Sequence, residues 1–330
     1  MKILADKSLP NIRQLFGNYF DLKFYNNEGE LQDIIKSSDI LICRSTLRVD
    51  STLLQNTKIQ CVATASSGTD HIDLKFLQQN NIKLFDAKGI NADAVANYVL
   101  ATIANITQKK LITGNRACVV GMGEVGSRVA RILAQLNYSC SYYDPYKIAT
   151  SNLASLTECD LICIHANLHN KQPYPSFNMF NYSLLKALKP GTTIINAARG
   201  KIVNEDDLQK FDLTYCTDVF ANEPVINDTT IEKATICTPH IAGHSIEAKA
   251  NAVIHLSKLI HTNFNMPFDT NYQQNRHKIE LDRNWQEEVL SLYNPQTESE
   301  TLKSASNKTE AFITLRKAHK YRHQFICCEK

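Results

Sequence analysis

The chain has 330 residues, about twice the length of a typical domain, so we expect two lobes with room for a small appendix. Hydrophobic residues make up 43% and charged residues 21%, a composition that can bury a core. The net charge of +3 is too small and too dispersed to indicate a nucleic-acid partner. No apolar run approaches the roughly 20 residues that a membrane helix needs, and no targeting segment is expected.

The ten cysteines are scattered along the chain, and several stand inside apolar, strand-like runs. No C-x-x-C pair faces a second such pair, or a histidine pair, at the spacing of a zinc site. We therefore predict no metal site and expect reduced, mostly buried thiols in a cytoplasmic protein.

Short β-rich runs alternate with helix-compatible stretches in the first part of the chain, which favours a parallel α/β sheet. The predicted strands are 2–6, 22–25, 40–43, 61–64 and 82–85. Residues 91–108 then form a long helix candidate, with Asn91 as its candidate N-cap.

The same rhythm restarts in the second part of the chain. Its predicted strands are 117–120, 139–143, 161–164, 193–196, 215–219 and 235–237. A helix at 245–263 follows, and we assign it back to the first lobe as a return crossing. The expected fold is therefore α/β, with two Rossmann-like, doubly wound parallel-sheet lobes and a cleft between them. The first lobe comprises 1–90 and 243–268, and the second comprises 91–242.

The remaining segment, 269–330, is polar and contains the only tryptophan, Trp285. Its stretch 296–308, rich in Ser, Thr, Glu and Lys, is predicted to be a loop. The segment is too small for a core of its own, and we interpret it as a dimerisation appendix.

A glycine-rich turn follows the strand 117–120 and opens into a helical stretch. It is a G-x-G-x-x-G hexad, formed by Gly121, Met122, Gly123, Glu124, Val125 and Gly126. In such a turn the first glycine permits the tight bend, the second lets a diphosphate approach the backbone, and the third lets helix and strand pack closely. The strand before it and the helix after it make this signal specific for a dinucleotide.

An acid, Asp144, ends the next strand, 23 residues after Gly121. This spacing fits the carboxylate that accepts hydrogen bonds from the adenosine ribose diol. A carboxylate would repel a 2′-phosphate, so the cofactor is predicted to be NAD rather than NADP. Glu124, an unusual neighbour for a diphosphate, is expected to point outward.

Three successive strand ends in the second lobe carry charged or titratable residues. Arg199 follows 193–196, Asp218 and Glu223 follow the next strand, and His240 follows the last. Because ligands bind at the carboxyl ends of strands in doubly wound sheets, we expect Arg199, Glu223 and His240 to converge there.

These residue types suit the oxidation of a secondary alcohol next to a carboxylate. His240 can take the hydroxyl proton while C2 gives a hydride to a nicotinamide. Glu223 can orient the ring and stabilise imidazolium. Arg199 can clamp the substrate carboxylate bidentately, and Asp218 can accept a hydrogen bond from the nicotinamide carboxamide.

With these motifs the chain resembles the D-isomer-specific 2-hydroxyacid dehydrogenases, whose Arg, Glu and His occupy the motifs described above. Further motifs narrow the resemblance to the branch that oxidises 4-phospho-D-erythronate in pyridoxal 5′-phosphate biosynthesis. They are 2–6, 44–46, 63–71, 239–243 and the tail stretch 315–322. The tail is similar to that branch's C-terminal dimerisation domain, although it is shorter, and the resemblance therefore implies a homodimer.

The resemblance also implies roles for individual residues. Ser45 and Ser66 would contact the substrate, and Asp144, Asp218 and Gly243 would contact NAD. Three positions depart from the family pattern. Ser66 stands where the family usually has Thr, His244 replaces a substrate-contacting Tyr, and Ala166 replaces a Thr near the cofactor.

The residues themselves favour a phosphorylated substrate. Arg44 and Arg48 surround the hydroxyl-bearing Ser45 and Thr46 at a strand end of the first lobe. Backbone N–H groups, hydroxyls and a guanidinium form a good phosphate receptor. We further hypothesise that Arg316, Lys317 or Arg322 reaches across a dimer to the partner's phosphate site.

Two other interpretations stay open. The chain could be another 2-hydroxyacid dehydrogenase, acting on 3-phosphoglycerate, glycerate or a lactate-like acid. It could also be an NAD-sensing binding module of the corepressor type, which shares this fold and could keep the glycine-rich turn. The complete Arg, Glu and His set favours an enzyme over the second alternative.

Overall fold

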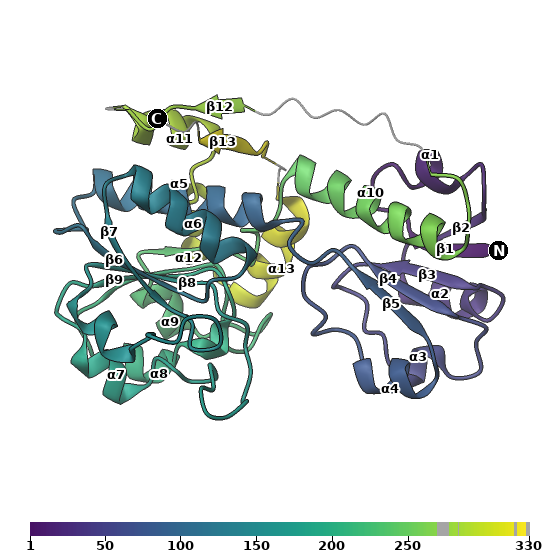
Figure 1. The fold of residues 1–330 in the computed structure, drawn as a ribbon, viewed down its shortest axis with the longest axis horizontal. Coiled ribbons are helices and arrows are strands. Elements are labelled where there is room, and N and C mark those ends of the chain that lie inside the picture. The colour runs from purple at the N-terminus through teal and green to yellow at the C-terminus, as the bar shows by residue number, and fades with distance from the viewer. Residues whose placement is uncertain (269–276, 283, 320–321, 328–330) are drawn as a thin grey trace. The chain divides into compact units, whose positions relative to one another are not determined.

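The computed structural model describes residues 1–268, 277–282, 284–319 and 322–327. It divides into two compact units (Figure 1). One contains Met1–Asn91 and residues 245–268, and the other contains Ala92–His244 and the described residues from 277 onward. The chain therefore passes between the units after Asn91 and after His244.

The first unit is built on a five-stranded parallel sheet with the strand order β2-β1-β3-β4-β5. Its strands are β1 (Lys2–Asp6), β2 (Asp21–Tyr25), β3 (Ile40–Cys43), β4 (Cys61–Thr64) and β5 (Lys83–Asp86). The central strands β3 and β4 are fully buried runs of apolar and small residues, as strands covered on both faces should be. From β1 the chain continues to β2 on one side of β1, and β3 then lies on the other side. The carboxyl ends of β1 and β3 therefore flank a topological switch point.

Helices cover both faces of this first sheet. They are α1 (Ile12–Phe16), α2 (Glu28–Ile35), α3 (Ser51–Leu54), α4 (Leu74–Gln79) and α10 (Ile246–Asn263). Apolar residues of α1 and α10 pack on one face, and those of α2, α3 and α4 pack on the other. Ser245 accepts a hydrogen bond from the Ala248 N–H and so caps α10 as this helix begins.

The second unit contains a six-stranded parallel sheet in the order β11-β10-β9-β8-β6-β7. Its strands are β6 (Arg116–Val120), β7 (Ser139–Tyr143), β8 (Leu161–Ile164), β9 (Thr193–Asn196), β10 (Thr214–Thr217) and β11 (Ile236–Cys237). The predicted fold class of two doubly wound parallel sheets is therefore confirmed, and the predicted strands are observed to within two residues.

The helices of the second unit also form two layers (Figure 1). They are α5 (Ala92–Gln108), α6 (Glu124–Gln135), η1 (Leu153–Glu158), α7 (Tyr182–Ala187), η2 (Gly200–Ile202), α8 (Glu205–Leu208) and α9 (Asp228–Lys233). Residues of α5 and α6 pack on one face of the sheet, and those of α7, α8 and α9 pack on the other. Helix α5 is buried along almost its whole length, from Ala92 to Ile106.

The C-terminal region adds apolar residues to both cores of the second unit. Its elements are β12 (His277–Ile279), α11 (Trp285–Leu292), α12 (Gln296–Ser304), α13 (Lys308–Ala318) and β13 (Phe325–Cys327). Trp285 and Val289 join the core around α5, whereas Leu302 and Phe312 join the core on the opposite face. Dimerisation through this region stays a prediction.

The prediction of a loop at 296–308 is wrong, because residues 296–304 form α12. The sequence offers one large apolar residue in this helix, Leu302, so its periodicity gives no clear signal. Tertiary contacts stabilise the helix instead. The Ser299 hydroxyl accepts a 3.0 Å hydrogen bond from the Cys237 N–H, and Lys303 donates to the Ala234 carbonyl.

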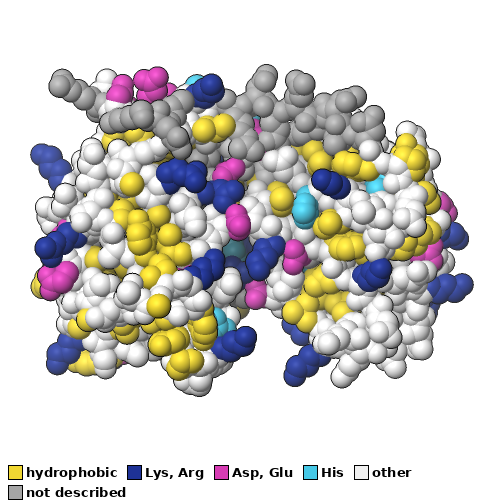
Figure 2. Space-filling model, in the orientation of Figure 1, with side chains coloured by type: hydrophobic (Ala, Val, Ile, Leu, Met, Phe, Trp, Pro, Cys, Tyr) yellow, Lys and Arg dark blue, Asp and Glu magenta, His cyan; other side chains and the backbone are white. Residues whose placement is uncertain are grey.

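Other expectations from composition concern thiols, charge, metals and membranes. The nine cysteines within the described ranges are free and seven of them are buried, so the predicted burial is confirmed. On the face shown in Figure 2, cationic and anionic side chains of the described residues are interspersed. In the same part of the chain, no cluster of three potential ligands could hold a metal ion. Nor does any described helix have the length and apolar character of a membrane span.

Candidate active site

The glycine-rich turn lies at the carboxyl end of β6, where the order of the second sheet reverses between β7 and β8. Gly121 has φ +90°, and a Cβ there would lie 2.6 Å from the backbone of Ala166. A Cβ at Gly126 would lie 1.9 Å from the Gly121 carbonyl oxygen. Both positions therefore need glycine, one for conformation and contact and the other for the close approach of α6.

Gly123 differs from Gly121 and Gly126, because a Cβ at Gly123 would meet nothing within 4 Å. It is the N-cap of α6, a helix of 12 residues whose first N–H groups point out of its N-terminus. Open space beside a positive helix end fits the diphosphate of a dinucleotide. Met122 and Val125 pack against the core, so they would meet a cofactor mainly through their backbone.

Asp144 is tied to this turn directly. Its Oδ2 accepts a 2.8 Å hydrogen bond from the Met122 N–H, and Lys147 Nζ donates to the Met122 carbonyl at 2.7 Å. The carboxylate expected to bind a ribose diol therefore lies beside the turn expected to bind the diphosphate. Glu124 points outward, with its side chain 61% exposed and paired with Arg128 at 2.9 Å.

His240 and Glu223 form a hydrogen-bonded pair. His240 Nδ1 lies 2.6 Å from Glu223 Oε2, and both side chains are partly buried. The other carboxylate oxygen, Oε1, accepts a hydrogen bond from the Phe220 N–H at 2.9 Å. Because Glu223 engages Nδ1, a neutral imidazole would carry its proton there and would present Nε2 as the proton acceptor.

The pKa of Glu223 is lowered by its surroundings. Burial by itself would raise this pKa, but the nearby His240, its hydrogen bond and the Phe220 N–H outweigh that effect. The charge of Arg316, on α13, lowers the pKa further. Glu223 therefore stays ionised and is ready to stabilise a positive charge on His240.

Arg199 is linked to this pair through backbone packing. It stands directly before η2, and its Nη1 donates to the Ala198 carbonyl at 2.8 Å. A Cβ on the next residue, Gly200, would lie 1.9 Å from the Phe220 carbonyl carbon. The Arg199 segment thus lies directly against the residue whose N–H holds Glu223.

Asp218 holds the loop that carries His240. It is 1% exposed, and its carboxylate accepts hydrogen bonds from the Thr238 hydroxyl and from the Ile241 and Ala242 N–H groups, at 2.7 to 2.8 Å. Burial raises the pKa of Asp218, although His240 and these donors oppose the shift. The structure therefore gives Asp218 a structural task that the sequence interpretation did not include.

Sequence reasoning missed Glu205, a buried carboxylate on α8. Its Oε1 accepts a hydrogen bond from the Ala221 N–H at 2.8 Å, and its Oε2 accepts one from the Thr230 hydroxyl at 3.0 Å. Burial raises the pKa of Glu205. Glu205 therefore holds the 220–223 loop through the Ala221 N–H. No motif in the sequence indicates this role of Glu205.

The predicted substrate residues of the first unit lie at the carboxyl edge of its sheet. Arg44 follows β3, and its Nε lies 2.7 Å from Oδ2 of Asp6, which ends β1. This ion pair stands at the switch point of the sheet. Ser45 is exposed and Ser66 is partly exposed after β4, whereas Arg48 pairs with Asp50 on the surface.

Lys249, on α10, is a second cation near Arg44 that the sequence analysis did not single out. Burial and the charge of Arg44 lower the pKa of Lys249 to about 8, and Asp6 opposes this shift. Arg44 and Lys249 thus place two cations beside the Asp6 carboxylate, and cations at a switch point suit an anionic ligand. A lysine inside an amphipathic helix gives no sequence signal of this kind.

Gly243 and His244 follow the His240 loop and belong to the second unit, whereas Arg44, Ser45 and Ser66 belong to the first. The His244 N–H donates to the Ile241 carbonyl at 2.8 Å. Its ring centroid lies 6.0 Å from that of His319, which in turn bonds Glu298 at 3.0 Å.

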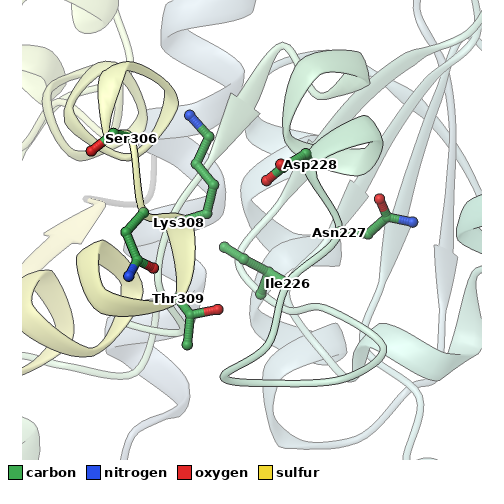
Figure 3. Close-up of a pocket in the computed structure, with 7 residues that line it drawn as sticks. Ile226, Asn227, Asp228, Ser306, Lys308 and Thr309 are labelled. Atoms are coloured by element: carbon green, nitrogen blue, oxygen red, sulfur yellow. The ribbon is translucent and has the colours of Figure 1, made fainter.

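Figure 3 shows a shallow depression of about 570 Å³ between the loop before α9 and the start of α13. None of the predicted site residues lines it. Three of its polar side chains are already engaged, since Asn227 and Asn307 cap α9 and α13, and Lys308 donates to two backbone carbonyls. We therefore assign the depression to the packing of the C-terminal helices.

The chain is similar to known proteins over nearly its whole length. Residues 94–242 match the family model described as D-isomer specific 2-hydroxyacid dehydrogenase, NAD binding domain. The chain is 44% identical to erythronate-4-phosphate dehydrogenase of Legionella pneumophila (strain Lens), over 98% of this chain and 95% of that protein. It is 32% identical to the enzyme of the same name from Coxiella burnetii (strain RSA 331 / Henzerling II), over 98% and 93%.

Solved structures show the same fold. The NAD⁺-bound 3-phosphoglycerate dehydrogenase of Entamoeba histolytica superposes with a TM-score of 0.68 at 24% identity, over 83% of this chain and 99% of that one. The NAD complex of formate dehydrogenase from Staphylococcus aureus gives 0.67 at 22% identity, over 82% and 97%. At such identities the likeness concerns the fold alone.

Proposed function

Because this chain belongs to the erythronate-4-phosphate dehydrogenases, within the D-isomer specific 2-hydroxyacid dehydrogenases, we propose that it oxidises 4-phospho-D-erythronate. The product would be (R)-3-hydroxy-2-oxo-4-phosphooxybutanoate, formed in pyridoxal 5′-phosphate biosynthesis. The chain is an NAD-dependent oxidoreductase of the 2-hydroxyacid class. The observation that carries the proposal is the His240–Glu223 pair, in the unit whose sheet also bears the dinucleotide turn.

His240 is the proposed acid–base group. Its Nε2 removes the proton of the C2 hydroxyl during oxidation and returns a proton in the reverse direction. Bound NAD supplies the acceptor for the C2 hydride. Glu223 keeps the ring oriented through Nδ1 and stabilises the imidazolium that proton transfer creates, because its lowered pKa keeps it ionised.

Arg199 is the proposed clamp for the substrate carboxylate. A guanidinium can donate two parallel N–H bonds to a carboxylate, and it also polarises the neighbouring C2 oxygen. The packing of Gly200 against Phe220 supports this role, since it fixes the Arg199 segment relative to the Glu223 loop. Proton transfer and carboxylate binding would then occur on one connected framework.

The cofactor contacts come from the second unit. The first N–H groups of α6 and the open space at Gly123 would receive the diphosphate, and Asp144 would bind the ribose diol. Ala166, whose backbone lies against Gly121, would border the same site, as would Asp218 and Gly243.

The phosphate of the substrate is assigned to the first unit. Arg44 and Ser45 follow β3 at its switch point, and Lys249 adds a second cation there. Ser66 and His244 are proposed to contact the rest of the substrate. A cytoplasmic location and a homodimer that uses the C-terminal region are further parts of this proposal.

A hydride-transfer assay tests the substrate. The purified protein with NAD should form NADH fastest, at equal concentrations, with 4-phospho-D-erythronate. The comparison acids are unphosphorylated erythronate, 3-phosphoglycerate, glycerate and D-lactate. Faster oxidation of one of these would move the assignment to another 2-hydroxyacid dehydrogenase. NAD binding without oxidation of any acid would favour a cofactor-sensing module.

A further inference from the structure

Arg322 is a buried cation in the C-terminal region. It is 6% exposed and lies between α13 and β13. Its Nη2 donates to the carbonyls of Ala242 at 2.6 Å and Ala94 at 3.0 Å, and its Nη1 makes a longer bond of 3.4 Å to the Ile241 carbonyl. The guanidinium carbon lies 4.3 Å from the centroid of the Tyr293 ring. A buried charge persists only where such partners replace water.

These contacts correct one hypothesis about the tail. We expected Arg322 to be a candidate for reaching across a dimer to a partner's phosphate site. Instead its side chain is turned into its own unit and engaged with backbone carbonyls. Of the three cations named in that hypothesis, Arg322 is therefore engaged inside its own unit.

The carbonyls that Arg322 holds belong to the loop of His240. His240 adopts φ +56°, in the left-handed region, and its N–H donates to the Thr238 carbonyl at 2.9 Å. For a residue with a side chain this conformation is unfavourable, so the surroundings must hold it in place. The two residues that follow, Ile241 and Ala242, provide the points at which the loop is held.

The Ile241–Ala242 segment is held from two sides. Asp218 accepts both of its N–H groups, and Arg322 donates to both of its carbonyls. Arg322 also connects this segment to Ala94 in the first turn of α5, a helix buried along almost its whole length. The catalytic loop is thereby anchored to a rigid element through one guanidinium.

We propose that Arg322 is a positioning residue that sets the place of the His240 imidazole for proton transfer. This inference rests on the proposed function, since it concerns the acid–base group of the same site. A planar guanidinium has several N–H donors in a fixed fork, and this fork can reach carbonyls on two separate segments. A lysine ammonium is a compact point charge and cannot reproduce this arrangement. Displacing a reacting group by about 1 Å can lower turnover by about 10²-fold.

The test uses the full-length Arg322→Ala and Arg322→Lys variants, with Arg131→Ala, an exposed arginine on α6, as the matched control. Both Arg322 variants should lower kcat for 4-phospho-D-erythronate roughly 10- to 100-fold, whereas the Kd of NAD stays close to that of the unmodified protein. Guanidinium chloride at millimolar concentration should restore part of the kcat of Arg322→Ala. It should restore nothing in His240→Ala.

Several outcomes would overturn the inference. Unchanged kcat in Arg322→Lys would do so, because the fork would then be dispensable. Loss of NAD binding in parallel with kcat, without rescue by guanidinium, would assign Arg322 to overall folding alone. If Arg322→Ala fails to fold, Arg322→Lys decides the question. The proposed function fails separately, if the unmodified protein binds NAD but does not oxidise 4-phospho-D-erythronate.

Discussion

The carboxyl edges of the two parallel sheets are built differently. In the second unit, the loops after β10 and β11 are held by buried carboxylates, Asp218 and Glu205, and by the partly buried Glu223. In the first unit, Ser45 is exposed and Arg44 is held by one ion pair, with its side chain 38% exposed. The edge proposed to carry out proton transfer is thus preorganised, and the edge proposed to bind phosphate is left accessible.

This difference follows from what each edge has to do. Acid–base groups need fixed positions, because proton transfer depends steeply on geometry. A phosphate can be bound by charge and hydroxyl groups that tolerate small shifts and stay partly hydrated. Substitutions in the second unit should therefore change kcat, and substitutions in the first should change KM for the phosphorylated acid.

The largest effect is expected for His240→Ala. Turnover should fall roughly 10²–10⁴-fold, the usual contribution of a positioned acid–base group, while NAD still binds. Steady-state kinetics with a parallel NAD titration by fluorescence measures both quantities. His277→Ala, which changes an exposed histidine on β12, is the matched control. Equal turnover in His240→Ala would remove His240 from the mechanism.

A smaller loss is expected for Arg199→Lys. The lysine keeps the charge but loses the second parallel N–H bond, so kcat/KM should fall by about 10- to 100-fold, the equivalent of one charged hydrogen bond. The loss should be smaller with a substrate analogue that has an amide in place of the carboxylate. If both substrates lose kcat/KM equally, Arg199 does not bind the carboxylate.

Asp144→Ala probes the cofactor end of the second unit. Loss of the carboxylate should weaken NAD binding by about 10-fold and relax the preference for NAD over NADP, because the repulsion of a 2′-phosphate disappears. The ratio of kcat/KM for the two cofactors measures this change. An unaltered ratio would mean that Asp144 only holds the Met122 N–H.

The smallest effect is expected from Lys249, in the accessible edge of the first unit. With a pKa of about 8, Lys249 is charged below pH 8 and loses its charge as the pH rises through that value. The KM for 4-phospho-D-erythronate should therefore increase a few-fold, by about 0.5–1 kcal/mol of binding, between pH 7 and pH 9. Lys249→Gln should raise KM at pH 7 and flatten this pH dependence. A profile with the same slope in the variant would exclude Lys249 from phosphate binding.

Much of the second unit could be predicted because its signals are local. Gly121, Gly123 and Gly126 lie between a strand and a helix, and their spacing in this context indicates a dinucleotide turn. Arg199, Glu223 and His240 each follow a buried strand, and parallel strands deliver their carboxyl ends to one edge. The shared edge explains why His240 and Glu223 are close enough to form a hydrogen bond. The length of that bond could not be predicted from the sequence.

The residues that hold these loops could not be predicted in the same way. Glu205 and Arg322 lie on segments whose composition looks solvated, and their burial depends on contacts with residues 16 or more positions away. The same reason explains α12, which periodicity did not indicate and which a hydrogen bond from Cys237 to Ser299 helps to hold. Sequence patterns depend on residues that are close together in the chain. Glu205, Arg322 and Ser299 instead bind backbone groups of residues that are far away in the sequence.

The sequence by itself determined the two doubly wound sheets, the glycine-rich turn and the three strand ends that carry Arg199, Glu223 and His240. These features depend on hydrophobic periodicity and on residue types at short spacing, both of which are local. Only the tertiary structure decided that Asp218 holds the N–H groups of the His240 loop and that Arg322 holds its carbonyls. Buried charges find their partners through packing, because desolvation makes each depend on whichever polar groups the fold brings near.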